Sequence, residues 1–160
     1  MIKSDEGFWV SKFYADSTFA VHPDFKSHTG GCLLLSDKGG AVMNASSKQK
    51  LNTRSSTEAE LVGADDVIGK LLWFQEFIKC QGFSLGKTTL FQDNQSAILL
   101  ETKGKASSTK RTRHINIRYF HITDLVEKGR IGVEYCNTKD MVADFFTKPL
   151  QGEQFLRFKN

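Results

Sequence analysis

The sequence predicts an α/β fold in which a mixed five-stranded sheet is flanked by helices. The expected elements follow the order βββαβααβα, so three antiparallel strands come first, and helical crossovers to two parallel strands come later. The chain has 160 residues, of which 39% are hydrophobic and 25% are charged, an ordinary balance for a globular domain. We therefore expect a single domain over residues 1–160, with its core at about 8–150 and a short C-terminal tail at 151–160.

Three strand-like segments open the chain. Residues 8–15 are rich in aromatic and β-branched side chains and place Asp16 at the end of the first strand. Residues 31–36 and 41–46 predict the next two strands, and the Asp-Lys-Gly-Gly sequence at 37–40 between them is typical of a hairpin turn.

A long amphipathic helix is expected after the hairpin. Ser55 and Glu58 fit a capping box, in which both side chains accept hydrogen bonds from backbone N–H groups at a helix start. Apolar residues from Leu61 to Ile78 then recur at helical spacing, and the pattern ends near Gly82. This apolar stripe is expected to be core.

The second half of the chain alternates strands and helices. The pattern predicts a strand at 88–92, helices at 95–100 and 115–128, a strand at 131–136 and a helix at 141–147. Asp93 directly follows the first of these strands, Asn94 opens the helix after it, and Pro149 stops the last helix.

Composition narrows the classes of partner. The net charge is +4, and the stretch from Thr102 to Tyr119 holds six basic residues and no acid, which is compatible with a polyanionic partner. No apolar run is long enough to span a bilayer, so we expect no membrane partner. Cys32, Cys80 and Cys136 form no C-x-x-C pair, so we expect three buried thiols and neither a disulfide nor a zinc site.

Four carboxylates are candidates for a functional site. Asp16 and Asp93 follow strands, where α/β sheets bind ligands, whereas Glu60 and Asp144 lie on predicted helices. Clustered carboxylates resist ionisation unless cations neutralise them, and two Mg²⁺ ions about 3.5–4 Å apart can serve phosphodiester cleavage. Spacing alone does not select these four among 18 acids, and each taken singly fits a surface acid or, for Asp93, a helix cap.

Five segments share their sequence and order with one known family. They are residues 14–17 (YADS), 55–61 (SSTEAEL), 92–98 (QDNQSAI), 110–115 (KRTRHI) and 143–150 (ADFFTKPL). Together they resemble the ribonuclease H region at the end of copia-type retrotransposon polyproteins, over about residues 13–150 of this chain. The resemblance implies a ribonuclease H-like fold and an endonuclease that hydrolyses the RNA strand of RNA–DNA hybrids, leaving 5′-phosphate and 3′-hydroxyl ends.

The resemblance also assigns catalytic and metal-binding roles. The family's four carboxylates correspond to Asp16, Glu60, Asp93 and Asp144. Glu60 is preferred over Glu58 because a large apolar residue follows it. Two Mg²⁺ ions are implied, for which Mn²⁺ can substitute: Asp16 bridges them, Asp93 binds the ion that activates water, and Glu60 and Asp144 each complete one ion's ligands. Glu60 would also contact the ribose 2′-hydroxyl, which distinguishes RNA from DNA.

Contacts with the hybrid are implied for further residues. These are Ser17, Ser55, Ser56, Asn94, Gln95, Lys110, Arg111, Arg113 and His114. Helix capping is the alternative role for Asn94, and a solvated surface is the alternative for the basic residues. The chain departs from cellular members of the family in two ways. It has no histidine at 137–140 to assist proton transfer or product release, which predicts slower turnover, and it has Ser17 in place of the glycine at which substrate approaches the backbone.

The expected partner in the parent polyprotein is an upstream reverse transcriptase domain. The resemblance implies an intracellular, cytoplasmic location, in the virus-like particle of the parent element. Two other functions stay open: a ribonuclease H-like module that binds nucleic acid with little or no cleavage, and an integrase- or resolvase-like nuclease that cuts DNA. The Asp144 motif near the C-terminus favours ribonuclease H, and the presence of all four carboxylates favours an active enzyme.

Overall fold

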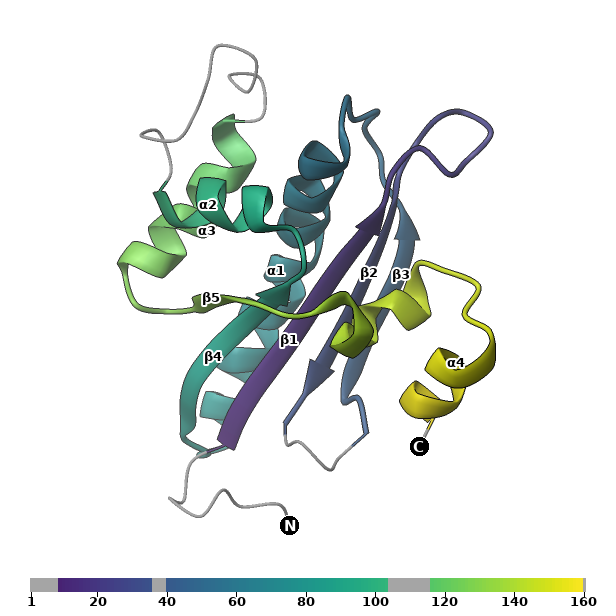
Figure 1. Cartoon of the computed structure of the whole chain (residues 1–160). Coiled ribbons are helices and arrows are strands. Elements are labelled where there is room, and N and C mark those ends of the chain that lie inside the picture. The colour runs from purple at the N-terminus through teal and green to yellow at the C-terminus, as the bar shows by residue number, and fades with distance from the viewer. Residues whose placement is uncertain (1–8, 36–39, 104–115, 160) are drawn as a thin grey trace.

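The computed structural model describes residues 9–35, 40–103 and 116–159 of the chain. The strands of this part form one sheet in the order β3-β2-β1-β4-β5 (Figure 1). They are β1 (Trp9–Thr18), β2 (His28–Leu34), β3 (Met43–Lys48), β4 (Leu85–Gln92) and β5 (Gly132–Tyr135). The first three are antiparallel neighbours, whereas β4 is parallel to both β1 and β5. The predicted mixed five-stranded sheet is therefore confirmed.

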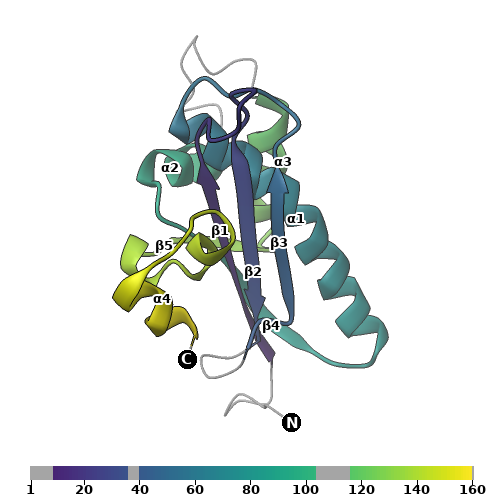
Figure 2. The same cartoon turned by 90° about the vertical axis from the view of Figure 1, so that its right-hand side faces the viewer.

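Helices and the C-terminal segment cover opposite faces of the sheet. The long helix α1 (Ser56–Cys80) lies on one face and contacts both α2 (Gln95–Lys103) and α3 (Asn116–Glu127). The C-terminal segment lies on the other face, as the two views show (Figure 1, Figure 2). It contains two short 3-10 helices, η3 (Thr138–Asp140) and η4 (Val142–Phe146), and the helix α4 (Gly152–Lys159).

Alternation along β1 divides the core between these faces. Phe13 and Ala15 belong to the main core, which α1 and α3 complete with residues such as Ile68 and Ile122. Tyr14 packs instead against a smaller cluster of Cys136, Met141 and Ala143. Because successive side chains of a strand point to opposite faces, Asp16 lies on the same face as Tyr14. That is the face covered by the C-terminal segment.

Three expectations need correction. The strand β1 continues to Thr18 because it stays paired with β2 as far as His28, so Asp16 lies inside a strand and not at its end. The predicted last helix is a 3-10 helix over Val142–Phe146, a tighter form usual for such short pieces. Cys80 is exposed, because it follows the last buried residue of α1, Ile78.

The C-terminal tail holds a helix that the sequence pattern did not predict. α4 has only eight residues, too few for a helical pattern over several turns, and it buries none of its side chains. It is held by tertiary contacts, among them the stacking of Phe155 on Phe145. In the described residues, no helix has the length and apolar character needed to cross a membrane.

Candidate active site

Asp16 and Asp93 lie on neighbouring parallel strands. Tyr14 of β1 pairs with Phe91 of β4, and each aspartate comes two residues later along the chain. Side chains two residues apart in a strand point to the same side, so this register brings the two carboxylates together. Asp16 is 2% exposed, whereas Asp93 is only partly buried because it follows the end of β4.

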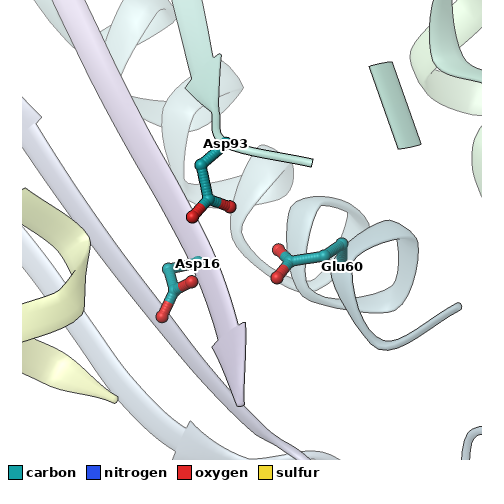
Figure 3. Close-up of side chains that lie close together, drawn as sticks. All are labelled: Asp16, Glu60 and Asp93. Carbon is teal, nitrogen blue, oxygen red and sulfur yellow. The ribbon is translucent and has the colours of Figure 1, made fainter. Parts of the chain in front are cut away.

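Glu60 reaches the same place from α1. The helix begins where the sequence predicts: Ser55 Oγ accepts a hydrogen bond from Glu58 N at 3.2 Å, and the Glu58 carboxylate accepts one from Arg54 N at 2.8 Å. The Glu58 carboxylate is thus occupied by the cap. Glu60, two residues later, is the glutamate that faces the sheet. One carboxylate oxygen of each of Asp16, Glu60 and Asp93 lies within 4.8 Å of the other two, and Figure 3 shows the three side chains close together. These residues are termed the three-carboxylate group.

The surroundings of Glu60 oppose its negative charge. Its side chain is 6% exposed, and Oε2 has no hydrogen-bond partner among the described residues. Burial, and then the charges of Asp16 and Asp93, raise the pKa of Glu60 well above its usual range, against smaller opposing effects of the Ser17 backbone and Lys148. A cation at this point would favour the ionised form.

Asp144, which is part of η4, lies beside Asp16 and is paired with a lysine. Lys148 Nζ is 2.7 Å from Asp144 Oδ1 and 3.5 Å from Asp16 Oδ2. Burial raises the pKa of Asp144 to about 6; the charge of Asp16 acts in the same direction, while Lys148 acts in the opposite one. Lys148 therefore bridges the two aspartates.

Close packing of η4 on the sheet brings Asp144 to Asp16. Gly30 of β2 is the register partner of Asp16, and a Cβ atom there would lie only 2.6 Å from Thr147 Cγ2 and 2.8 Å from the Ala143 carbonyl oxygen. The Thr147 hydroxyl donates to the Asp16 carboxylate. A side chain at position 30 would therefore push this segment away from the sheet.

The donor set fits a hard divalent cation. Mg²⁺ prefers oxygen ligands from a few carboxylates, and the three-carboxylate group supplies them from three different elements. The buried and unpartnered Oε2 of Glu60 is an independent sign that a positive group belongs there. Within the described residues, Asp144 lies outside this group and is linked to it through Asp16 and Lys148.

Four residues at the site were not among the predicted ones. Thr138 donates to Asp93 Oδ2 at 2.9 Å, and Gln154 of α4 donates to Asp144 Oδ2 at 3.4 Å. Thr147 and Lys148 contact the aspartates as described above. The last two follow Asp144 by three and four residues, the spacing of neighbours on a helix, so their sequence positions carried a signal. No local spacing relates Thr138 or Gln154 to the carboxylates.

The predicted substrate contacts at residues 17, 55 and 56 are placed differently from one another. Ser17 is buried: its Oγ accepts from Gln49 Nε2 at 3.4 Å and would lie 2.0 Å from a Cβ atom at Gly63 of α1. This hydroxyl faces the helix, so only the backbone of Ser17 is left to approach a ligand. Ser55 and Ser56 are exposed at the start of α1, although the Ser55 hydroxyl is used by the cap.

The remaining predicted contacts lie at the start of α2 or outside the described residues. Asn94 caps α2, since its Oδ1 accepts from Ser96 N at 3.1 Å and from Ala97 N at 3.2 Å. Gln95 is exposed beside it. The four residues of the basic segment, Lys110, Arg111, Arg113 and His114, lie outside the described residues.

Sequence comparison relates the chain to transposon proteins. No protein-family model matches it. It is 30% identical over 146 residues to the retrovirus-related Pol polyproteins of transposon TNT 1-94 from Nicotiana tabacum and of transposon RE1 from Arabidopsis thaliana. It is 27% identical to the transposon Ty1-NL2 Gag-Pol polyprotein of Saccharomyces cerevisiae. Each match covers 91% of this chain and 11%, 10% and 8% of the respective relative, so the chain spans about a tenth of their length.

Comparison with solved structures identifies the fold. The N-terminal ribonuclease H domain of a Mycobacterium tuberculosis protein has a TM-score of 0.62 at 11% identity, covering 87% of this chain and 91% of that one. LC11-RNase H1 in complex with an RNA/DNA hybrid has a TM-score of 0.59 at 14% identity, covering 85% and 92%. Prototype foamy virus protease-reverse transcriptase matches with a TM-score of 0.55 at 13% identity, over 92% of this chain and 21% of that one. The chain is therefore a homologue of retrotransposon Pol polyproteins, and its fold is that of ribonuclease H domains.

Proposed function

We propose that this chain is a metal-dependent endonuclease that hydrolyses the RNA strand of RNA–DNA hybrids during retrotransposon reverse transcription. The observation that carries the proposal is the three-carboxylate group, in which two buried carboxylates and the partly buried Asp93 converge and one oxygen of Glu60 is unpartnered among the described residues. Buried like charges are costly unless a cation neutralises them. Cleavage is proposed to leave 5′-phosphate and 3′-hydroxyl ends.

Asp16, Glu60, Asp93 and Asp144 would hold two Mg²⁺ ions, or Mn²⁺ in their place. The first three residues converge on one position, while Asp16 and Asp144 flank the ammonium group of Lys148. When bound, such ions neutralise charge at the scissile phosphate and make bound water more acidic. A second ion at Asp144 requires that Lys148 moves away.

The residues around the carboxylates would select and orient the hybrid. Glu60 is proposed to accept a hydrogen bond from the ribose 2′-hydroxyl, the group that distinguishes RNA from DNA. The exposed Ser56 lies at the N-terminus of α1, where the helix dipole favours a phosphate. Gln95 is exposed at the corresponding end of α2.

The basic segment is proposed to bind the backbone of the hybrid. Lys110, Arg111 and Arg113 would each neutralise a phosphate and release counterions without reaching the scissile bond. Replacing all three with alanine should raise KM more than it lowers kcat. It should also flatten the dependence of log K on log salt by up to about 0.9 for each phosphate that is no longer neutralised.

The neighbours support the proposed substrate and partner. LC11-RNase H1 is described in complex with an RNA/DNA hybrid, and the foamy virus neighbour is a protease-reverse transcriptase. Because the chain matches only a small part of each transposon polyprotein, an upstream reverse transcriptase domain is proposed as its partner in the parent protein.

The deciding experiment compares three duplexes of one sequence. An RNA–DNA hybrid, a double-stranded RNA and a double-stranded DNA, each end-labelled, are incubated with the protein in Mg²⁺, and the product ends are mapped. Cleavage of the RNA strand of the hybrid alone, with 5′-phosphate ends, is expected. Cleavage of the DNA duplex would instead support an integrase-like nuclease. Binding of the hybrid without cleavage would support a non-catalytic module.

A further inference from the structure

Glu101 carries a carboxyl group in the interior that the site described above does not use. It lies on α2 and is 0% exposed. It shares the buried face of that helix with Ala97 and Leu100, which pack against Leu61 of α1 and Phe120 of α3. A carboxylate in such apolar surroundings is strongly disfavoured unless its oxygens are satisfied.

The neighbour of Glu101 is Gln92, the last residue of β4. Gln92 is also 0% exposed, and its Nε2 donates a hydrogen bond to Glu101 Oε1 at 3.1 Å. The other oxygen of each side chain, Oε2 of Glu101 and Oε1 of Gln92, is buried and has no partner among the described residues. An ionised carboxylate has no hydrogen to donate, so it leaves both of these acceptors unsatisfied.

A proton on Glu101 would satisfy both of these unpartnered oxygens. A carboxylic acid can pair with a primary amide through two hydrogen bonds: the amide N–H donates to the acid carbonyl, and the acid O–H donates to the amide carbonyl. The first of these is the bond observed between Gln92 and Glu101. We propose that Glu101 is a neutral carboxylic acid paired in this way with Gln92, and that the pair positions Asp93 for metal binding.

Gln92 is anchored at both its backbone and its side chain, directly before Asp93. Its backbone carbonyl accepts a hydrogen bond from Cys136 N at 2.8 Å, and its side chain is held by α2. Asn94, on the other side of Asp93, caps α2. Asp93 thus lies between two anchored residues, and Glu101 is a positioning residue that acts through Gln92.

Burial raises the pKa of Glu101 to about 8, and the Gln92 amide is the opposing influence. The elements packed against α2 are α1, α3, β4 and β5. From these elements the apolar Leu61 and Phe120 and the amide of Gln92 contact its buried face, and among the described residues no charged group shifts the pKa of Glu101. The neutral acid is therefore favoured by its surroundings at neutral pH.

Infrared spectroscopy tests the protonation state directly. The carbonyl stretch of a protonated carboxylic acid is recorded at neutral pH in saturating Mg²⁺, so that the carboxylates of the active site are ionised. The wild type should show this band, Glu101→Gln should lack it, and Glu134→Gln, which changes an exposed carboxylate of β5, should retain it. A wild type without the band, or a band that survives in Glu101→Gln, would overturn the neutral acid.

The pH dependence of stability gives a second measure that needs neither metal nor activity. A raised pKa in the folded state adds stability that is present below the unfolded pKa and lost as the pH rises through about 8. Glu101→Gln keeps a two-bond amide pair but cannot titrate. The stability of the wild type relative to this variant should therefore fall between about pH 5 and pH 8 and be constant above. A difference that does not change over this range would contradict the proposal.

The positioning role is tested by metal affinity. Glu101→Gln should keep the Mn²⁺ affinity of the wild type, whereas Glu101→Leu, which leaves the Gln92 amide unpaired, should weaken it by about 10-fold, in the range for residues that orient metal ligands. Equal affinity of both variants would refute positioning. This part and the Mg²⁺-saturated infrared spectra rest on the proposed function, but the comparison of stability with pH does not, so a failure of one is distinguishable from a failure of the other.

Discussion

Asp144 and Glu60 are both buried carboxylates next to Asp16, but their neighbours differ in charge. Asp144 faces the ammonium of Lys148 at 2.7 Å, whereas Glu60 faces the carboxylates of Asp16 and Asp93. Burial raises the pKa of both. The charges of Asp16 and Asp93 raise the pKa of Glu60 further. The charge of Lys148 instead lowers the pKa of Asp144.

The difference indicates the order in which the site is filled. On the Glu60 side the buried Oε2 of Glu60 has no hydrogen-bond partner among the described residues, and Lys148 comes no nearer than 3.5 Å to Asp16, so an external ion meets a weaker internal competitor there. On the Asp144 side the protein supplies its own cation, which an external ion must displace. We therefore expect the first divalent ion at the three-carboxylate group and a weaker second one at Asp144.

The largest effect is expected from Asp16→Asn, because Asp16 belongs to both sides. Loss of a residue that merely orients a metal ligand costs about 10–100-fold, so loss of this carboxylate should lower kcat on the hybrid by more than about 100-fold. Folding should be intact by circular dichroism. Asp24→Asn, at an exposed aspartate paired with Lys48, is the matched control and should retain wild-type turnover. Substantial cleavage by Asp16→Asn would show that the three-carboxylate group is not the site of cleavage.

Without metal, stability should fall as the pH rises toward neutrality. A carboxylate whose pKa is raised adds stability that is fully present below the unfolded pKa and lost as the pH rises through the folded pKa, which is about 6 for Asp144. The difference between the ordinary pKa of 3.8 and about 6 in the folded protein corresponds to a change on the order of 3 kcal/mol in the free energy of unfolding. Urea unfolding in EDTA from about pH 4 to pH 7 measures this change in the free energy of unfolding. The slope should be smaller in Asp144→Asn, and an unchanged slope would exclude Asp144 as its source.

A smaller effect is expected from Lys148→Met, for which the chain offers a close control. Lys128 pairs with Asp124 at the same 2.7 Å and the same i,i+4 spacing, but that pair is exposed. In EDTA at neutral pH, Lys148→Met should lose on the order of 2 kcal/mol, less than a fully buried pair because Lys148 is 35% exposed. Lys128→Met should lose only about 0.3–0.5 kcal/mol.

Saturating Mg²⁺ should narrow the gap between these two lysine variants, because an ion at Asp144 takes over the role of the ammonium group. Urea unfolding in Mg²⁺ checks this. Equal losses by both variants in EDTA would mean that burial does not distinguish the two pairs.

The sequence predicted best where structure depends on neighbours in the chain. The start of α1 follows from the capping box of Ser55 and Glu58, which is a local interaction. The end of β1 was predicted too early, because its last three residues, 16–18, pair with residues 28–30 of β2 and do not extend the apolar run. The helix α4 was missed for the same reason, since it depends on a contact with Phe145.

The site was predictable to the same extent. The motifs selected Asp16, Glu60, Asp93 and Asp144 as candidates. The strand register and α1 bring the first three together, and Asp144 lies beside them. Motifs did not show that Lys148 would bridge two carboxylates, because this requires the approach of η4 to Gly30 across the sheet. Nor did they reveal the pairing of Gln92 with Glu101, which depends on how α2 packs.

Counting bound ions tests most directly whether the clustered carboxylates form a divalent metal centre. Free Mn²⁺ is measured by electron paramagnetic resonance as the ion is added to the wild type, to Asp16→Asn and to Asp24→Asn. The wild type and Asp24→Asn should take up one ion tightly and a second more weakly, and Asp16→Asn should lose the tight site. The same isotherm for all three proteins would contradict the claim.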